Sequence, residues 1–406
     1  MKKIIVVGGG AAGLLAAYAA SKNNNQVILL EKNEKLGKKI YITGKGRCNV
    51  TTSVSDNEFF NGIINNPKFL FSAINSFNST KLINLLERNG LKTKVERGNR
   101  VFPESDKASD VTKTLEKILI KNGVDIRLNT KVLEILTIDG VIKGVKTDLG
   151  EILGDGVIVC TGGISYPLTG STGDGFMFAK SVGHNITELK PALVGIELKG
   201  SDFLDLQGVS LKNVTITATA NNKIIFKDFG EMLFTHFGIS GPIVLSCSSR
   251  INKLDINNVC FFIDLKPALA PETLNNRLLK EFKENNTKTL STTMRALLPK
   301  ALIEVVLEQA GIFGNKNCSE ITATERESII RALKQLKFQP KRLRPIDEAI
   351  VTSGGICVKE INPKTMESKL IKGLFFAGEV IDVDAVTGGY NLQIAFSTGF
   401  TAGNNA

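Results

Sequence analysis

Three glycines near the start of the chain, Gly8, Gly10 and Gly13, have the spacing Gly-x-Gly-x-x-Gly. Glycine lets a backbone approach a pyrophosphate closely, and the N-terminus of a following helix stabilises the negative charge of the phosphates. The spacing therefore predicts a dinucleotide site that includes the backbone of Ala11 and Ala12. The alternative is a tight turn that only packs a strand against a helix.

The elements around these glycines favour the dinucleotide site. We expect a buried strand over 3–7, a helix over 12–22 and a second strand over 26–30. Glu31 follows directly, where an acidic residue binds the ribose hydroxyls of adenosine. The basic start and apolar run resemble a secretory signal, but the glycines interrupt that run after four β-branched residues. The order predicts an α/β fold with a Rossmann-type nucleotide-binding unit.

A basic loop broken by glycines follows over 37–49 and is suited to wrapping a phosphate and the edge of a flavin. The alternative is an ordinary solvated, lysine-rich loop, but the glycines and the Arg-Cys-Asn ending favour a cofactor. We expect the following residues at the cofactor: Lys32, Lys39, Thr43, Gly44, Gly46, Arg47, Cys48 and Asn49.

Two later segments favour FAD over NAD(P) as the resident cofactor. Buried strands over 157–160 and 374–377 end in glycines, and a terminal helix over 392–403 follows a Gly-Gly-Tyr-Asn turn. The N-terminus of that helix can stabilise negative charge on a reduced flavin. This layout is typical of FAD proteins with the glutathione-reductase fold, and no second fingerprint for a dedicated NAD(P)H domain is present. The further residues expected at FAD are Val132, Thr161, Gly162, Gly163, Gly378, Glu379, Asp382, Gly389, Tyr390 and Asn391.

Two side chains are candidate catalytic proton donors, because the flavin itself would supply the redox chemistry. The thiol of Cys48 would protonate one carbon while hydride reaches the adjacent carbon, with Arg47 tuning its acidity. Its alternative role is a small thiol that packs against the flavin. His236 precedes Pro242, which suits the first position of a helix, although a lone histidine is more often structural. Further loop residues serve either substrate binding or loop structure: Arg100, Asp106, Tyr166 and Asp174.

The composition excludes several other classes of protein. The 406 residues include six scattered cysteines without a Cys-x-x-Cys pair and only two histidines. A disulfide scaffold, a zinc ribbon and a multi-histidine metal site are therefore excluded, and we expect no metal. The cysteine usage favours a reducing, cytoplasmic compartment. No apolar run approaches the roughly 18 residues that span a membrane, so we expect no membrane partner.

The charge balance points to a polyanionic partner. The chain carries 51 Lys and Arg against 40 Asp and Glu, a formal net charge of +11. FAD phosphates would account for the basic residues between 32 and 47. A second cluster has no such cofactor and is either a solvated surface or an RNA-binding patch. It consists of Lys334, Lys337, Lys341, Arg342 and Arg344.

Motifs along nearly the whole chain resemble the bacterial BaiN/YhiN-type (RdsA-like) flavoproteins, NAD(P)/FAD-dependent oxidoreductases. The matching segments are GGGAAG (8–13), ITGKGRCN (42–49), RVFPESDKAS (100–109), CTGGISYPLTGSTGDG (160–175), GEMLFTHFGISGP (230–242), NPKTMESK (362–369) and GLFFAGEVIDVDAVTGGYNLQIAFSTG (373–399). The resemblance implies a glutathione-reductase-type FAD-binding Rossmann fold with an inserted β-barrel-like domain and a small helical domain. Short β-rich runs at 214–218, 224–226 and 259–263, followed by helical spacing, agree with it. We expect a discontinuous FAD domain over 1–190 and 346–406, a β-rich insertion over 191–270 and a helical subdomain over 271–345.

Three functions follow from these observations. The first is reduction of a C=C bond with NADH or NADPH as transient electron donor; the resembling family includes formation of dihydrouridine in ribosomal RNA and reduction of bile-acid rings. The basic charge favours the RNA substrate. The second is a flavin oxidase of a small amine such as aminoacetone. The third is a non-catalytic flavoprotein that binds RNA.

Overall fold

A computed structural model of all 406 residues places the predicted N-terminal strand in the middle of a five-stranded sheet. The sheet has the order β20-β10-β1-β2-β6, and each neighbouring pair of strands is parallel. Four of the strands are nearly continuous buried apolar runs, as expected for a parallel sheet covered on both faces. The strands are β1 (Lys3–Val7), β2 (Gln26–Leu30), β6 (Asp125–Arg127), β10 (Gly156–Val159) and β20 (Leu374–Phe376). The predicted α/β fold class is confirmed.

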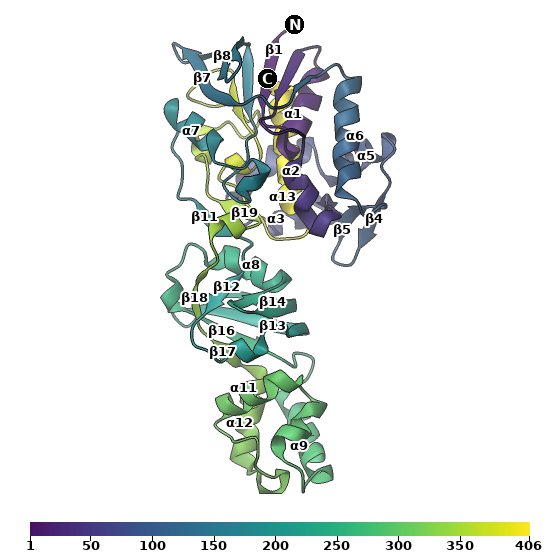
Figure 1. Cartoon of the computed structure of the whole chain (residues 1–406), viewed down its shortest axis with the longest axis vertical. Helices are drawn as coiled ribbons and strands as arrows, with labels where there is room; N and C mark the ends of the chain where they lie inside the picture. Colours follow the sequence, from purple (N-terminus) through teal and green to yellow (C-terminus); the bar gives the residue numbers. More distant parts are fainter. The chain divides into compact units, whose positions relative to one another are not determined.

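The first and last helices of the chain pack directly against each other, α1 (Ala11–Ser21, purple) beside α13 (Tyr390–Asn405, yellow; Figure 1). Two glycines of α13 make this approach possible. A Cβ atom at Gly399 or Gly403 would lie 2.1 Å from a backbone carbonyl oxygen of α1. Any larger residue at either position would therefore separate the two helices.

These elements belong to a first unit formed by residues 1–191 and 346–406, with its own hydrophobic core. Part of the predicted basic loop is helical, because α2 and a 3₁₀ turn over Thr43–Gly46 occupy it. The other helices and strands of this unit form small sheets and covering layers. They are α2 (Lys38–Ile42), α3 (Asp56–Asn61), α4 (Phe71–Ser76), α5 (Ser79–Arg88), α6 (Ala108–Lys121), α7 (Asp174–Ser181), β3 (Thr51–Thr52), β4 (Thr93–Glu96), β5 (Arg100–Pro103), β7 (Val132–Ile138), β8 (Val141–Thr147) and β9 (Gly150–Leu153). The strands β11 (Lys190–Ala192) and β19 (Val351–Ser353) flank the second unit in the chain.

Residues 192–345 form the second unit, whose single hydrophobic core joins a β-rich part and a helical part. Its seven-stranded antiparallel sheet has the order β17-β16-β13-β14-β15-β12-β18. The strands are β12 (Ile196–Leu198), β13 (Ser210–Ala220), β14 (Lys223–Thr235), β15 (Gly238–Ser240), β16 (Val259–Asp264), β17 (Leu336–Phe338) and β18 (Pro340–Leu343). The helices are α8 (Pro242–Ile251), α9 (Pro271–Glu284), α10 (Leu290–Thr293), α11 (Lys300–Ala310) and α12 (Ala323–Lys334). Neither unit contains a helix with the length and apolar character needed to cross a membrane.

Candidate functional site

A long pocket lies within the first unit at the carboxyl edge of the parallel sheet. It contains about 1310 Å³ of space, including its open mouth. Val7, Leu30, Thr161 and Gly378 line it, and each lies at or just beyond the end of a different strand. The carboxyl ends of parallel strands meet at one edge of a sheet, and ligands of open α/β sheets bind there.

The three fingerprint glycines shape one wall of the pocket. A Cβ atom at Gly8 would lie 2.6 Å from the carbonyl oxygen of Cys160, and one at Gly13 would lie 1.8 Å from the carbonyl oxygen of Gly8. A Cβ atom at Gly10 would meet no atom within 4 Å. Gly10 is the N-cap of α1, and no side chain caps this helix. The first and third glycines thus allow close packing, and the second keeps the α1 N-terminus open for a phosphate.

Glu31 is held rigidly at one end of the pocket. Its carboxylate accepts hydrogen bonds from the backbone N–H of Gly9 at 2.8 Å and of Asn33 at 2.8 Å, and its side chain is buried. The residue lines the pocket directly after β2. This position suits a carboxylate that accepts hydrogen bonds from ribose hydroxyls.

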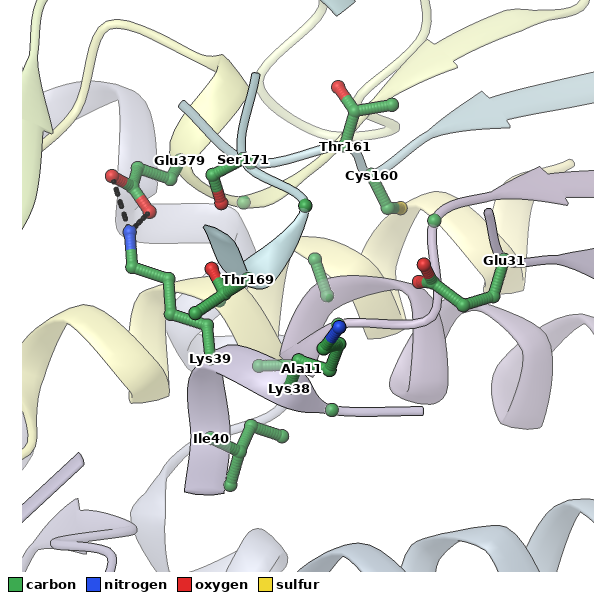
Figure 2. A pocket seen from close by; sticks show the side chains of 18 of the residues that line it. Ala11, Glu31, Lys38, Lys39, Ile40, Cys160, Thr161, Thr169, Ser171 and Glu379 are labelled. Atoms are coloured by element: carbon green, nitrogen blue, oxygen red, sulfur yellow. Dashed lines mark hydrogen bonds and ion pairs between the residues drawn. The ribbon is translucent and has the colours of Figure 1, made fainter. Parts of the chain in front are cut away.

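An ion pair between Lys39 and Glu379 lies at the other side of the pocket from Glu31 (Figure 2). The Nζ atom of Lys39 lies 2.7 Å from Oε2 of Glu379. Glu379 also accepts hydrogen bonds from the hydroxyl of Ser165 at 2.9 Å and from the backbone N–H of Thr352 at 2.8 Å. The pair therefore fixes two side chains that were predicted to bind the cofactor.

Three basic residues that line the pocket, Lys32, Lys38 and Lys39, are each paired with a carboxylate. The expectation that FAD phosphates account for the basic residues between 32 and 47 stays a prediction. Lys32 lies 2.7 Å from Asp174, and Lys38 lies 3.2 Å from Glu34. With Lys39 also paired, the N-terminus of α1 is the element best placed to stabilise phosphate charge.

The N-terminal turn of α13 completes the pocket. Asn391 lines it, and its side chain holds the backbone of Ala385 through two hydrogen bonds of 2.8 and 2.9 Å. Gly389 has a φ of +96°, and a Cβ atom there would lie 2.3 Å from the carbonyl oxygen of Thr51. Tyr390 does not line the pocket; its ring packs on Phe59 with 4.9 Å between centroids. The turn is thus fixed by close packing, with the helix N-terminus at the pocket.

Three of the predicted cofactor residues carry buried polar atoms that have no hydrogen-bond partner within the protein: Asn49 Oδ1, Thr161 Oγ1 and Asp382 Oδ1. Buried polar atoms in folded proteins are nearly always hydrogen-bonded. Of the three residues, Thr161 lines the pocket, where the hydroxyl and phosphate groups of a dinucleotide offer such a partner. The donor set and the glycine-shaped wall therefore fit FAD.

Cys48 lies behind the pocket wall. It is completely buried, has a φ of +61° and does not line the pocket. Its backbone N–H donates to the carbonyl oxygen of Thr43 at 3.0 Å, and Thr43 does line the pocket. Burial raises the pKa of the thiol to about 11, against a weaker opposing effect of the Thr43 hydroxyl. The thiol is thus protonated at neutral pH.

Arg47 is engaged with carboxylates, and burial rather than Arg47 dominates the pKa of the neighbouring Cys48 thiol. Its guanidinium bonds Glu96 and lies 2.6 Å from Asp106, and it packs over the ring of Phe102 at 4.2 Å. Hydrogen bonds to Arg47 and Lys94 lower the pKa of Asp106, with Lys94 contributing most. Asp106 therefore anchors the loop that carries Cys48.

His236 belongs to the second unit. It is exposed in the turn between β14 and β15, and its ring lies edge-on to Phe237 at 5.1 Å. Pro242 begins α8 as predicted. A catalytic role for His236 stays a prediction.

Three of the five basic residues in the cluster over 334–344 pair with two carboxylates of the second unit. Lys334 lies 2.7 Å from Asp264, while Arg342 and Arg344 each lie 2.8 Å from Glu197. Lys337 and Lys341 are exposed. Most of this cluster therefore ties the sheet together.

The pocket brings together the majority of the predicted cofactor residues. Those that line it are Gly8, Gly10, Ala11, Ala12, Glu31, Lys32, Lys39, Thr43, Val132, Thr161, Gly162, Gly378, Glu379 and Asn391. Those that do not are Gly13, Gly44, Gly46, Arg47, Cys48, Asn49, Gly163, Asp382, Gly389 and Tyr390. Lining residues that sequence reasoning missed include Asn33, Lys38, Thr130, Lys131, Ser171, Phe178, Ile350 and Val351. Asn33 follows the predicted ribose-binding residue Glu31 by two positions, so it could have been predicted from the sequence. Ile350 and Val351 reach the pocket only because the chain returns to the first unit after residue 345.

The Rossmann sheet, the open α1 N-terminus and the buried carboxylate of Glu31 at the pocket are typical of a dinucleotide-dependent oxidoreductase. The chain belongs to the HI0933-like family, because the model described as HI0933-like protein Rossmann domain matches residues 2–405. The resemblance to RdsA-like flavoproteins is thereby confirmed, and the protein is an FAD-dependent oxidoreductase. The hypothesis of a non-catalytic flavoprotein is set aside.

Curated relatives match nearly the full chain. A 3-dehydro-bile acid delta(4,6)-reductase of Clostridium scindens is 33% identical, covering 93% of this chain and 92% of the relative. A ribosomal RNA dihydrouridine synthase of Escherichia coli is 30% identical, covering 91% and 89%, and one of Haemophilus influenzae is 32% identical, covering 92% and 90%. Among solved structures, a 3-ketosteroid delta1-dehydrogenase of Sterolibacterium denitrificans has a TM-score of 0.53 at 13% identity, covering 99% of this chain and 98% of that one. This structural similarity shows a shared fold.

Proposed function

We propose that this oxidoreductase uses NADH or NADPH to reduce a C=C bond conjugated to a carbonyl group, with a uridine of ribosomal RNA as its substrate. The observation that carries the proposal is the chemistry common to the three relatives. Two are named for making dihydrouridine and one for reducing an unsaturated bile acid, and both products arise by saturation of a ring C=C bond.

Reduction of the uracil ring needs one hydride and one proton. When bound and reduced by NAD(P)H, FAD would supply the hydride for one carbon of the C5=C6 bond, and the adjacent carbon would take the proton. Glu31 and the α1 N-terminus would hold the cofactor, and the Lys39–Glu379 pair would fix the opposite side of its site. The proposed proton source is the Cys48 thiol, which is protonated at neutral pH. The backbone N–H of Cys48 donates to the carbonyl oxygen of the pocket residue Thr43.

The charge of the protein favours RNA over a bile acid. A net charge of +11 attracts a polyanion at long range, whereas a steroid ring needs no such field. This substrate implies a cytoplasmic location. The bile-acid-like enone remains the second candidate, because the relative named for that reaction is 33% identical to this chain.

The direct test is nucleoside mass spectrometry of ribosomal RNA from a strain that lacks the gene, with the complemented strain as control. Loss of one dihydrouridine is expected. Purified FAD-loaded protein should also convert uridine in ribosomal RNA fragments when NADH or NADPH is supplied. An unchanged nucleoside profile together with reduction of a bile-acid dienone would assign the second candidate. Peroxide release from aminoacetone without NAD(P)H would instead indicate an oxidase.

A further inference from the structure

One face of the seven-stranded sheet in the second unit is open. Side chains alternate between the two faces of a strand, and in β13 the residues Val214, Ile216 and Ala218 are buried in the core. The intervening threonines, Thr215, Thr217 and Thr219, are partly exposed. The outer face of β13 therefore carries hydroxyl groups that no element of this unit buries fully.

A row of lysine and phenylalanine crosses this face. Lys227 on β14 lies opposite Thr217, Thr217 lies opposite Phe262 on β16, and Phe262 lies opposite Lys337 on β17. Figure 1 shows β14, β13, β16 and β17 in this order. Directly opposed residues share one face of a sheet, so the four side chains lie on the same side. Across three strand spacings of roughly 4.8 Å, the two lysines stand about 14 Å apart.

A second ring extends the row. Phe229 lies opposite Thr215, two residues along β14 from Lys227, and is 52% exposed. The neighbouring acid, Asp264, lies 2.7 Å from Lys334, so its charge is already matched. We call this surface the open face, defined by Thr215, Thr217, Thr219, Lys227, Phe229, Phe262 and Lys337.

We propose that the open face binds single-stranded RNA, an inference that rests on the proposed function and names where the substrate would dock. Exposed rings stack on bases, lysines bind phosphates and threonine hydroxyls donate to phosphate or sugar oxygens. The charge of the face favours this occupant over a second copy of the chain. A two-fold copy would bring the lysines of one face against those of the other, which is destabilising.

The test uses the full-length, FAD-loaded protein and a fluorescent uridine-rich single-stranded RNA, with anisotropy measured over a series of salt concentrations. The double variant Lys227→Gln/Lys337→Gln should weaken binding and reduce the slope of log K against log[salt] by about 1.4, since each phosphate contact to a single strand contributes roughly 0.7. The Phe229→Ala variant should weaken binding roughly tenfold at every salt concentration without changing the slope. Phe262→Ala should weaken binding in the same way. If the Phe262→Ala variant does not fold, Phe229→Ala alone still tests the proposal.

Two matched substitutions serve as controls. Lys280→Gln removes an exposed lysine on α9, and Phe313→Ala removes a ring that is 85% exposed, both in the second unit and outside the open face. Both should bind RNA as the unmodified protein does. Circular dichroism and flavin absorbance report whether each variant is folded and loaded.

The proposal is wrong if the unmodified protein does not bind the RNA, or if the open-face variants bind it as tightly as the controls. If the open-face variants bind RNA normally but lose the concentration-dependent self-association of the unmodified protein in sedimentation, the face is a protein interface instead. Dihydrouridine formation, assayed in parallel, separates the two proposals. If RNA binds through the open face but no dihydrouridine forms, only the proposed function is contradicted. If dihydrouridine forms and the open-face variants bind RNA normally, only the proposed role of the open face is contradicted.

Discussion

Single residues around the pocket are held in place before any ligand binds. Lys32, Lys38 and Lys39 each pair with a carboxylate, and Glu31 accepts hydrogen bonds from two backbone N–H groups. Side chains fixed in this way lose little further freedom when a cofactor binds, which favours affinity. The site thus depends on a few rigid groups, and removal of one should be measurable.

Replacement of Glu31 by glutamine should weaken FAD binding about tenfold, or roughly 1.4 kcal/mol. The amide has no charge and only one acceptor oxygen, whereas the carboxylate bonds Gly9 and Asn33 and would also accept from ribose. The measurement is the Kd of FAD from flavin fluorescence with the apoprotein. Glu34→Gln on the same loop, where the side chain is 61% exposed, should leave the Kd within about twofold. Equal affinities of the two variants would remove Glu31 from the ribose site.

The buried thiol of Cys48 should make stability depend on alkaline pH. Burial raises its pKa from an ordinary value of 9.0 to about 11 in the folded protein, so the folded state retains a proton that the unfolded chain loses. The stabilisation is complete below about pH 9 and is lost as pH rises towards 11, by about 3 kcal/mol. Burial also raises the pKa of Cys160 and Cys247, so both proteins should lose stability at pH 11. Urea unfolding at pH 8 and 11 should show a loss that is smaller by about 3 kcal/mol in Cys48→Ala than in the unmodified protein.

The same Cys48→Ala variant separates the two roles of the thiol. A proton donor contributes about 10² to 10⁴ to the rate, so product formation should fall by that factor while flavin reduction by NAD(P)H is retained. Unchanged product formation would leave Cys48 as a packing residue of the pocket wall.

Among the elements, those with a local signal could be predicted and those fixed by distant partners could not. The apolar runs and glycines of β1, β10 and β20 are sufficient to identify the parallel sheet. The basic loop gave no such signal for α2. Arg47 anchors the basic loop by binding carboxylates that lie 49 and 59 residues away in the sequence. Cys48 in the same loop has a positive φ that no sequence pattern predicts. The carboxylate partner of Arg342 in the basic cluster was unpredictable for the same reason, because it lies 145 residues earlier. The RNA-binding role of that cluster stays a prediction.

Packing of α13 on α1 should tolerate no side chain at Gly403. Alanine at an ordinary helix position stabilises by about 1 kcal/mol relative to glycine. Here its Cβ would lie 2.1 Å from the carbonyl oxygen of Ala16, so Gly403→Ala should destabilise by about 1–3 kcal/mol. Urea unfolding monitored by circular dichroism measures the change. Asn404→Ala, at an exposed position next to it, should be nearly neutral; stabilisation by Gly403→Ala would contradict the close contact.

At the scale of the whole molecule, two units have separate hydrophobic cores, and the pocket lies within one of them. A ligand stabilises the part that binds it by RT ln(1 + [L]/Kd). In calorimetry, FAD at about 100 times its Kd should therefore raise the melting temperature of one transition by an amount that corresponds to about 2.7 kcal/mol. The melting temperature of the other transition should not change. A single transition that shifts as a whole would show that the two units unfold together.

The strand order of the first unit also has a consequence for biosynthesis. The edge strand β20 and the helix α13 come from the last part of the chain, yet they complete the wall that β1 and α1 begin. A nascent chain on the ribosome that has not reached residue 395 lacks part of that wall. Tight FAD incorporation must then follow translation beyond residue 395, and until then the side of α1 that α13 covers stays exposed on the nascent chain.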